Sequence, residues 1–145
     1  MKCYADTSFL VSLYSSDANS ARADVWRQAN PGPLPYTLLH RLEIRNALWQ
    51  SVFRKMRAPH EASEVLQEME VDIIAGLLAM PTTSFDGVWK YAGELSDAHT
   101  PATGARSLDI LHVAAAKLLE VEEIVTFDQR QAGLALRIGL KVAVI

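Results

Sequence analysis

The stretch that decides the fold is "KCYADTSFLVSLY", residues 2–14. Small and larger side chains alternate over residues 2–5, which predicts a short strand. The apolar residues that follow the polar pair at positions 7 and 8 predict a helix over residues 8–16. Asp6 is therefore expected at the junction between a strand and a helix, and its role depends on what lies beside it there.

The rest of the chain alternates between short apolar segments and longer segments of helical period. Further strands are predicted at 34–37, 123–127 and 141–145, and residues 79–83 are predicted as a short strand or a turn. Helices are predicted at 17–30, 37–55, from Pro59 to about 78, and at 84–98, 107–119 and 128–138. The predicted N-caps are Thr37 for the helix at 37–55, Ser84 for that at 84–98, Ser107 for that at 107–119 and Asp128 for that at 128–138. Gly139 is predicted to end the last of these helices. Residues 99–106 are predicted to form a loop.

Short apolar strands separated by helices are typical of an α/β fold, with a parallel sheet covered by helices on both faces. In such sheets the chemistry gathers at the carboxyl ends of the strands. Asp6 follows the first strand, and Asp128 follows the strand at 123–127 in the same way. We therefore expect both carboxylates at one edge of the sheet.

Length and composition limit the class of protein. A chain of 145 residues, 50% hydrophobic and 21% charged, predicts a single globular domain over residues 1–145. The chain holds no apolar run of about 18 residues that predicts a membrane span, and Asp6 interrupts the start where a signal peptide needs an apolar segment. One cysteine and four scattered histidines exclude an internal disulfide and offer no zinc spacing.

The net charge of −3 argues against broad electrostatic binding of nucleic acid. A local basic patch is compatible with that charge. Arg54, Lys55 and Arg57 form a small basic cluster at the end of the helix predicted at 37–55. A solvated surface is the ordinary explanation of such a cluster, but these residues are also candidates for phosphate contacts.

Two further acids lie on apolar helices. Glu43 lies on a mostly apolar helical stripe, where an ion pair with Arg41 or Arg45 is the ordinary explanation of a half-buried carboxylate. Asp109 lies in the first turn of an apolar helix, where the helix dipole favours a negative charge.

The two acids at strand ends also have an ordinary explanation. Asp6 and Asp128 both suit the N-cap of the helix that follows them. His112, one turn after Asp109, is predicted to be a packing residue, because a lone histidine in an apolar helix is usually satisfied there.

Taken together, the four acids favour a metal site. If they converge without compensation, their mutual repulsion raises the pKa of one or more carboxyl groups until it holds a proton. A divalent cation removes that repulsion, and hard oxygen ligands favour Mg²⁺, with Mn²⁺ as the alternative. Such a site activates water and stabilises a phosphoryl transition state.

Four segments carry a family resemblance that covers the whole chain. They are "YADTSFLVSLY", "HRLEIRNAL", "RSLDILHVAAA" and "IVTFDQRQAGLA". In order and spacing the chain resembles PIN-domain nucleases, and specifically the VapC-type toxins of prokaryotic toxin–antitoxin pairs. Each segment alone is weak, but the four together in a chain of this length are specific.

The resemblance implies a three-layer PIN-like fold, with a central parallel sheet and helices on both faces, and an Mg²⁺-dependent endoribonuclease. Asp6 and Asp109 match the acids that hold metal most directly, and Glu43 and Asp128 match the other members of the acidic set. Metal-activated water is expected to cleave RNA and leave a 5′-phosphate and a 3′-hydroxyl.

The resemblance also implies supporting residues and partners. Thr7 and Thr126 match hydroxyl positions that support the acidic pocket. The expected partners are an RNA substrate, a cognate antitoxin and a second copy of the chain in a homodimer, in the prokaryotic cytoplasm and without a membrane. Trp26, Trp49 and Trp89 are expected to expose apolar surface for such a partner.

Two other classes of protein stay open at this point. One is a phosphohydrolase like the haloacid dehalogenases, with Asp6 as nucleophile; these enzymes usually carry a second aspartate two residues later, where this chain has Ser8. The other is a non-catalytic interaction module on the same fold, although all four acids are present.

Overall fold

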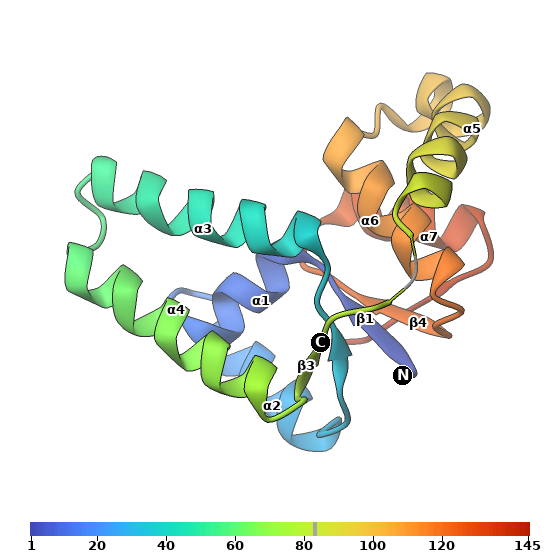
Figure 1. Ribbon diagram of the computed structural model, residues 1–145. Helices are drawn as coiled ribbons and strands as arrows, with labels where there is room; N and C mark the ends of the chain where they lie inside the picture. Colours follow the sequence, from blue (N-terminus) through green and yellow to red (C-terminus); the bar gives the residue numbers. More distant parts are fainter. Residues whose placement is uncertain (83) are drawn as a thin grey trace. The chain divides into compact units, whose positions relative to one another are not determined.

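The computed structural model describes residues 1–82 and 84–145. The chain forms two compact units, which are described separately (Figure 1). The first unit comprises residues 1–6 and 82–144, and the second comprises residues 7–81 together with residue 145. The boundary between the units therefore falls directly after Asp6. The prediction of one domain over residues 1–145 stays a prediction.

The first unit contains a parallel three-stranded sheet in the order β1-β4-β5. Its strands are β1 (Cys3–Ala5), β4 (Glu123–Val125) and β5 (Lys141–Val142). Ala5 pairs with Val125, so β1 and β4 end at the same level. Both residues are fully buried. The predicted strands are confirmed in place, and each is shorter at one end than the sequence pattern indicated.

Three helices complete the first unit: α5 (Asp86–Thr103), α6 (Ser107–Leu118) and α7 (Gln129–Arg137). Helix α6 packs against α5, α7 and β4. Its residues 110–116 are all buried, since neighbours lie on several sides of the helix. The buried His112 is hydrogen-bonded to the Tyr4 hydroxyl through Nδ1 at 2.7 Å, in agreement with its predicted packing role.

The loop predicted at residues 99–106 is wrong over residues 99–103, because α5 continues through Pro101 to Thr103, and it is confirmed over residues 104–106. Proline removes one intrahelical hydrogen bond, and near the end of a helix that loss is small. The Thr103 hydroxyl donates to the His99 carbonyl, and the Gly104 N–H donates to the Thr100 carbonyl. Gly104 then ends the helix at φ 63°, a left-handed conformation that glycine adopts easily.

Two predicted caps are also wrong. The N-cap of α6 is Arg106 and not Ser107, which is the first residue of the helix. The N-cap of α5 is Phe85, although the Ser84 hydroxyl accepts a hydrogen bond from the Asp86 N–H at 3.2 Å. Both boundaries lie within the one or two residues by which helix ends commonly vary.

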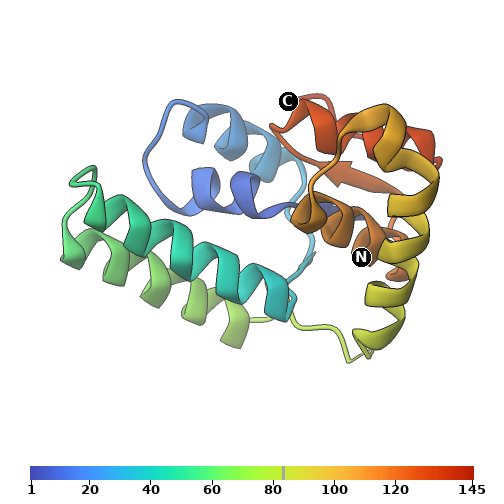
Figure 2. The ribbon, with the colours of Figure 1, turned by 90° about the horizontal axis from the view of Figure 1, so that it is seen from above.

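The second unit holds four helices and a two-stranded parallel sheet. They are α1 (Thr7–Tyr14), α2 (Ser20–Ala29), β2 (Leu34–Pro35), α3 (Leu38–Phe53), α4 (Pro59–Ile74) and β3 (Leu78–Ala79). Helices α3 and α4 lie side by side in both views (Figures 1 and 2). The predicted Thr37 cap of α3 is confirmed, as is Pro59 in the first turn of α4.

Helix α4 ends earlier than predicted. Gly76 has φ 76° directly after the C-cap, so the chain leaves the helix there and Leu78 enters β3. Ala79 in β3 favours the strand alternative for residues 79–83, and position 83 lies outside the described residues.

The predicted α/β class is confirmed, with seven helices and parallel strands among residues 1–82 and 84–145. In the part of the chain that the structure describes, no helix is long and apolar enough to cross a membrane.

Candidate active site

The first acid lies where β1 and β4 end. The Asp6 N–H donates to the Val125 carbonyl at 3.2 Å, which continues the strand pairing by one residue. The Thr126 hydroxyl donates to Asp6 Oδ2 at 2.6 Å. Asp6 is only 3% exposed. One hydrogen bond holds its backbone and another holds its carboxylate, so the position of the carboxylate is fixed.

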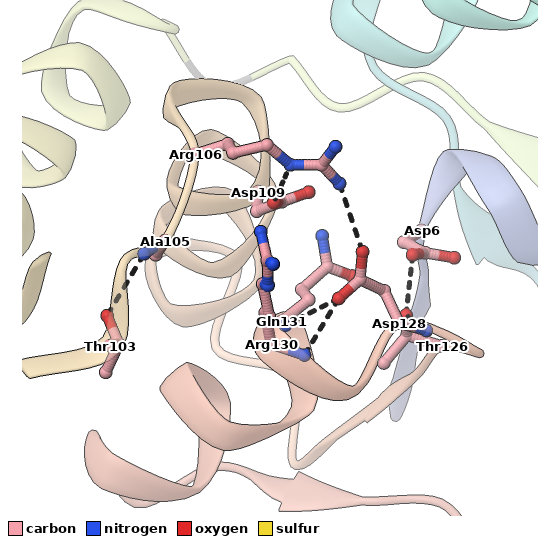
Figure 3. Close-up of polar contacts among 9 residues, drawn as sticks. All are labelled: Asp6, Thr103, Ala105, Arg106, Asp109, Thr126, Asp128, Arg130 and Gln131. Carbon is pink, nitrogen blue, oxygen red and sulfur yellow. Dashed lines mark hydrogen bonds and ion pairs between the residues drawn. The ribbon is translucent and has the colours of Figure 1, made fainter.

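Asp128 is held beside Asp6 by the same threonine. The Thr126 hydroxyl accepts a hydrogen bond from the Asp128 N–H at 2.9 Å (Figure 3). Asp128 Oδ1 in turn accepts from the N–H groups of Arg130 and Gln131 at 2.8 and 3.1 Å. Asp128 is therefore the N-cap of α7, as its ordinary explanation predicted. Capping uses Oδ1 and leaves Oδ2 for a second contact.

The partner in that second contact is Arg106, a cation that the sequence pattern did not single out. Arg106 Nε lies 3.1 Å from Asp109 Oδ2, and Arg106 Nη2 lies 3.2 Å from Asp128 Oδ2. Figure 3 shows the guanidinium reaching both carboxylates. The Arg106 side chain is 66% exposed, whereas Asp109 and Asp128 are 13% and 26% exposed. Its hydrogen bond and charge attraction with Asp109, together with the charge of Asp128, raise the pKa of Arg106.

A polar depression of about 430 Å³ adjoins the ion pair between Arg106 and Asp128. Its lining residues are Arg106, Asp128, Gln129 and Arg130. Two of the four carry a positive charge, so the depression suits an anionic group beside the carboxylate of Asp128.

Glu43 belongs to the second unit, on α3. Its Oε1 accepts a hydrogen bond from the Thr7 hydroxyl at 2.8 Å. Arg41 and Arg45, the expected partners in the ordinary explanation, both pair with Glu70 instead, at 3.7 and 3.2 Å. Both predicted supporting threonines thus contact a predicted acid, Thr126 in the first unit and Thr7 in the second.

The PIN domain family model matches residues 3–136. The chain belongs to the PIN-domain family. PIN domains are nucleases, and this membership supports a hydrolase that acts on nucleic acids. No curated protein matches the sequence of this PIN domain significantly.

Three solved structures share the fold of this PIN domain. PAE2754 from Pyrobaculum aerophilum matches with a TM-score of 0.66 at 18% identity, over 98% of this chain and 89% of its own. FitAcB from Neisseria gonorrhoeae matches with a TM-score of 0.63 at 16% identity, over 97% and 95%. VapBC2 from Rickettsia felis, bound to a DNA fragment from its promoter, matches with a TM-score of 0.61 at 14% identity, over 99% and 98%.

The residues of this PIN domain fit a hard divalent cation by their chemistry. Asp6, Asp109 and Asp128 all offer carboxylate oxygens, the ligands that Mg²⁺ and Mn²⁺ prefer. Within residues 1–82 and 84–145, no group of three or more His, Cys, Asp or Glu side chains lies close enough to hold a metal ion. In this conformation the Oδ2 atoms of Asp109 and Asp128 are instead directed at Arg106.

Cys3 of this PIN domain is not a candidate nucleophile. Burial, reinforced by the nearby Glu123 carboxylate, raises the pKa of the Cys3 thiol to about 12. The thiolate, which is the reactive form, is therefore scarce at neutral pH. Of the predicted basic cluster, Arg54 and Lys55 are exposed just beyond α3, and Arg57 is half-buried.

Proposed function

We propose that this PIN domain is a metal-dependent endoribonuclease and the toxin of a toxin–antitoxin pair. The observation that carries the nuclease proposal is the placement of Asp6 and Asp128 at the ends of adjacent parallel strands, joined through Thr126. The sequence resemblance to VapC-type toxins and the likeness to the VapBC2 fold support the toxin assignment.

We assign the metal to Asp6 and Asp109, with Asp128 and Glu43 as the other members of the acidic set. A bound Mg²⁺ or Mn²⁺ supplies activation of water and stabilisation of phosphoryl charge. Asp6 offers a carboxylate that its strand and the Thr126 hydroxyl hold in place. Glu43 is oriented by the Thr7 hydroxyl, and its contribution is tested separately because it belongs to the other unit.

The two other classes of protein have less support. Membership of the PIN-domain family speaks against a phosphohydrolase of the haloacid dehalogenase type. The presence of all four acids speaks against a non-catalytic module, since a binding role gives no reason to keep Asp6 buried and hydrogen-bonded at a sheet edge.

The nuclease proposal is tested by incubating the protein with RNA in Mg²⁺ and in EDTA. We expect internal cleavage in Mg²⁺, products with 5′-phosphate ends, and no cleavage in EDTA. Asp6→Asn should abolish cleavage, and the exposed Asp24→Asn on α2 should leave it unchanged. Cleavage that persists in EDTA or in Asp6→Asn would contradict the assigned site.

Thermal melting tests the metal assignment without RNA. Mg²⁺ should stabilise the wild type, because an ion that binds the folded state shifts the folding equilibrium. Asp6→Asn should lose most of that stabilisation and, without metal, melt no lower than wild type. A variant that melts far lower and keeps the Mg²⁺ response would make Asp6 a structural residue.

The proposed partners are supported by apolar side chains on the surface. Trp49 and Trp89 are exposed, as predicted, whereas Trp26 is buried edge-on against Phe9, so the expectation for Trp26 is wrong. Leu42 and Phe53 add further exposed apolar surface on α3. An apolar surface of this kind fits an amphipathic antitoxin segment or a second copy of the chain.

Purification after co-expression with the neighbouring reading frame tests the antitoxin proposal. We expect a stable complex, and a growth defect when the chain is expressed without its partner in a prokaryotic host. Recovery of the free chain with normal growth would argue against a toxin.

A further inference from the structure

Arg106 takes part in two ion pairs that join two helix starts. It is the N-cap residue of α6, Asp109 lies in the first turn of that helix, and Asp128 is the N-cap of α7. The guanidinium contacts Oδ2 of each carboxylate, at 3.1 Å and 3.2 Å. Asp128 uses its other oxygen, Oδ1, to cap α7. In Asp128, the oxygen that capping leaves is thus the one that Arg106 contacts, and in Asp109 the guanidinium contacts one of the two oxygens.

A divalent ion assigned to this acidic set has to compete with that guanidinium. Both cations are attracted to the same carboxylate oxygens, and a metal ligand distance of roughly 2.1 Å leaves no room for the hydrogen bond of the arginine on the same lone pair. The Arg106 side chain is 66% exposed. Release of the guanidinium therefore requires no opening of the core.

The surface next to the carboxylates offers a place for the released side chain. Arg106 already lines the 430 Å³ depression, together with Arg130. A guanidinium presents a fork of N–H donors that matches the oxygens of a phosphate group. The depression is lined by Asp128, so a phosphodiester bound there lies next to that carboxylate.

We propose that Arg106 is an internal counter-ion of Asp109 and Asp128 in the metal-free protein, and that its guanidinium is released when a divalent ion binds and then positions a phosphate of the substrate. The proposal rests on the metal-dependent nuclease proposed above. It makes Arg106 a positioning residue with two alternating partners, the carboxylate pair and the phosphate.

A purely structural role of Arg106 predicts the opposite change in metal affinity. If Arg106 only ties α6 to α7, its removal loosens the two carboxylates and weakens metal binding. If it competes with the metal, its removal strengthens metal binding. The sign of the change in metal affinity separates the two roles.

Titration calorimetry of the full chain with Mn²⁺, without RNA, measures that sign. Surface ion pairs are individually weak, so we expect Arg106→Gln to bind Mn²⁺ roughly threefold to tenfold more tightly than wild type. Arg130→Gln is the matched control, because it removes the same charge from the same depression, and its Mn²⁺ affinity should stay within about twofold of wild type. Equal or weaker binding by Arg106→Gln relative to Arg130→Gln would overturn the counter-ion role.

A second variant guards against a failure to fold. Arg106→Lys keeps the charge but lacks the fork that reaches two carboxylates at once, so its Mn²⁺ affinity should lie between those of wild type and Arg106→Gln. If Arg106→Gln does not melt cooperatively in EDTA, the lysine variant decides alone. An affinity for Mn²⁺ at or below that of wild type would then overturn the proposal.

RNA cleavage kinetics at saturating metal test the positioning role. Arg106→Gln should raise KM for RNA about threefold to tenfold and change kcat less. An unchanged KM would overturn the phosphate contact. A wild type that binds no Mn²⁺ refutes the proposed function and this inference together. A chain that binds Mn²⁺ but cleaves no RNA refutes the function alone, and the calorimetric comparison still decides the counter-ion role.

Discussion

Helices α6 and α3 are both rich in apolar residues, but they differ in how much of that apolar surface is covered. In α6, the seven consecutive residues 110–116 are buried. In α3, three of sixteen residues are buried, and they form one stripe at His40, Ile44 and Leu48. Other apolar residues of α3, among them Leu42 and Phe53, are exposed.

The difference teaches that neighbours, and not composition, decide what a helix buries. Helix α6 packs against two helices and a strand, and it presents Asp109 from a rigid support. Helix α3 packs against α1 and α4 and leaves apolar side chains in solvent. The first arrangement suits the metal ligand proposed at Asp109, and the second suits the partner surface proposed on α3.

Truncating one leucine in each helix should give the largest contrast in stability. Leu111 on α6 is 2% exposed and Leu42 on α3 is 69% exposed. We expect Leu111→Ala to lower the free energy of unfolding by about 3 kcal/mol, through lost burial and a cavity. Leu42→Ala should change it by less than about 0.5 kcal/mol. Urea denaturation measures both, and equal losses would refute the contrast.

Removing one carboxylate from each helix sharpens the comparison at the level of catalysis. We expect Asp109→Asn to lower kcat at least about a hundredfold, because it removes a proposed metal ligand. Glu43→Gln should lower it about tenfold, as expected for a supporting member of the set. Steady-state cleavage of one RNA substrate gives both values. A larger loss of kcat for Glu43→Gln than for Asp109→Asn would make Glu43 the metal ligand and Asp109 the supporting residue.

The exposed residues of α3 should matter for association more than for folding. Phe53 is 87% exposed. If α3 forms part of the proposed homodimer interface, Phe53→Ser should weaken dimerisation about tenfold, with little change in the melting temperature of the monomer. Light scattering across a concentration series measures the dimer. A wild-type monomer at micromolar concentration would remove the homodimer proposal.

The smallest expected effect concerns the start of α7. Asp128→Ala should cost about 1 kcal/mol of stability, because the N–H groups of Arg130 and Gln131 lose their acceptor. Asp128→Asn keeps a capping oxygen and should lower the stability by only about 0.3 kcal/mol. Its effect on cleavage should also be milder than that of Asp109→Asn. Thermal melts of the two variants side by side decide the first point, and an asparagine variant as unstable as the alanine variant would contradict it.

The sequence predicted best what depends on neighbouring residues in the chain. The strand before Asp6, the Thr37 cap and the Asp128 cap follow from local patterns, and all three are confirmed. The convergence of Asp6 and Asp128 followed from the rule that parallel strands end at one edge.

The sequence predicted least well what depends on contacts between distant segments. The pairing of Arg106 with Asp128 joins residues 22 positions apart, and no local pattern indicates it. Its pairing with Asp109, three residues later in the chain, is a local pattern from which Arg106 could have been predicted as part of the site. The expectation that Trp26 lies on the surface failed because Phe9, which covers it, lies on another helix and is not indicated by the local sequence. The run of α5 through Pro101 was missed because composition favoured a loop.

The pairing of β1 with β4 also has a consequence for the order in which the site forms during translation. Asp6 leaves the ribosome early, but the Thr126 hydroxyl that holds it is 120 residues further along the chain. At synthesis rates of about 5–20 residues per second, that distance corresponds to roughly 6 to 24 seconds. For almost all of that interval β1 lacks its neighbouring strand. Asp109 is made only late in the interval, and Asp128 is made just after it. A nascent copy of this chain therefore cannot complete the proposed metal site until almost all of the protein has been made.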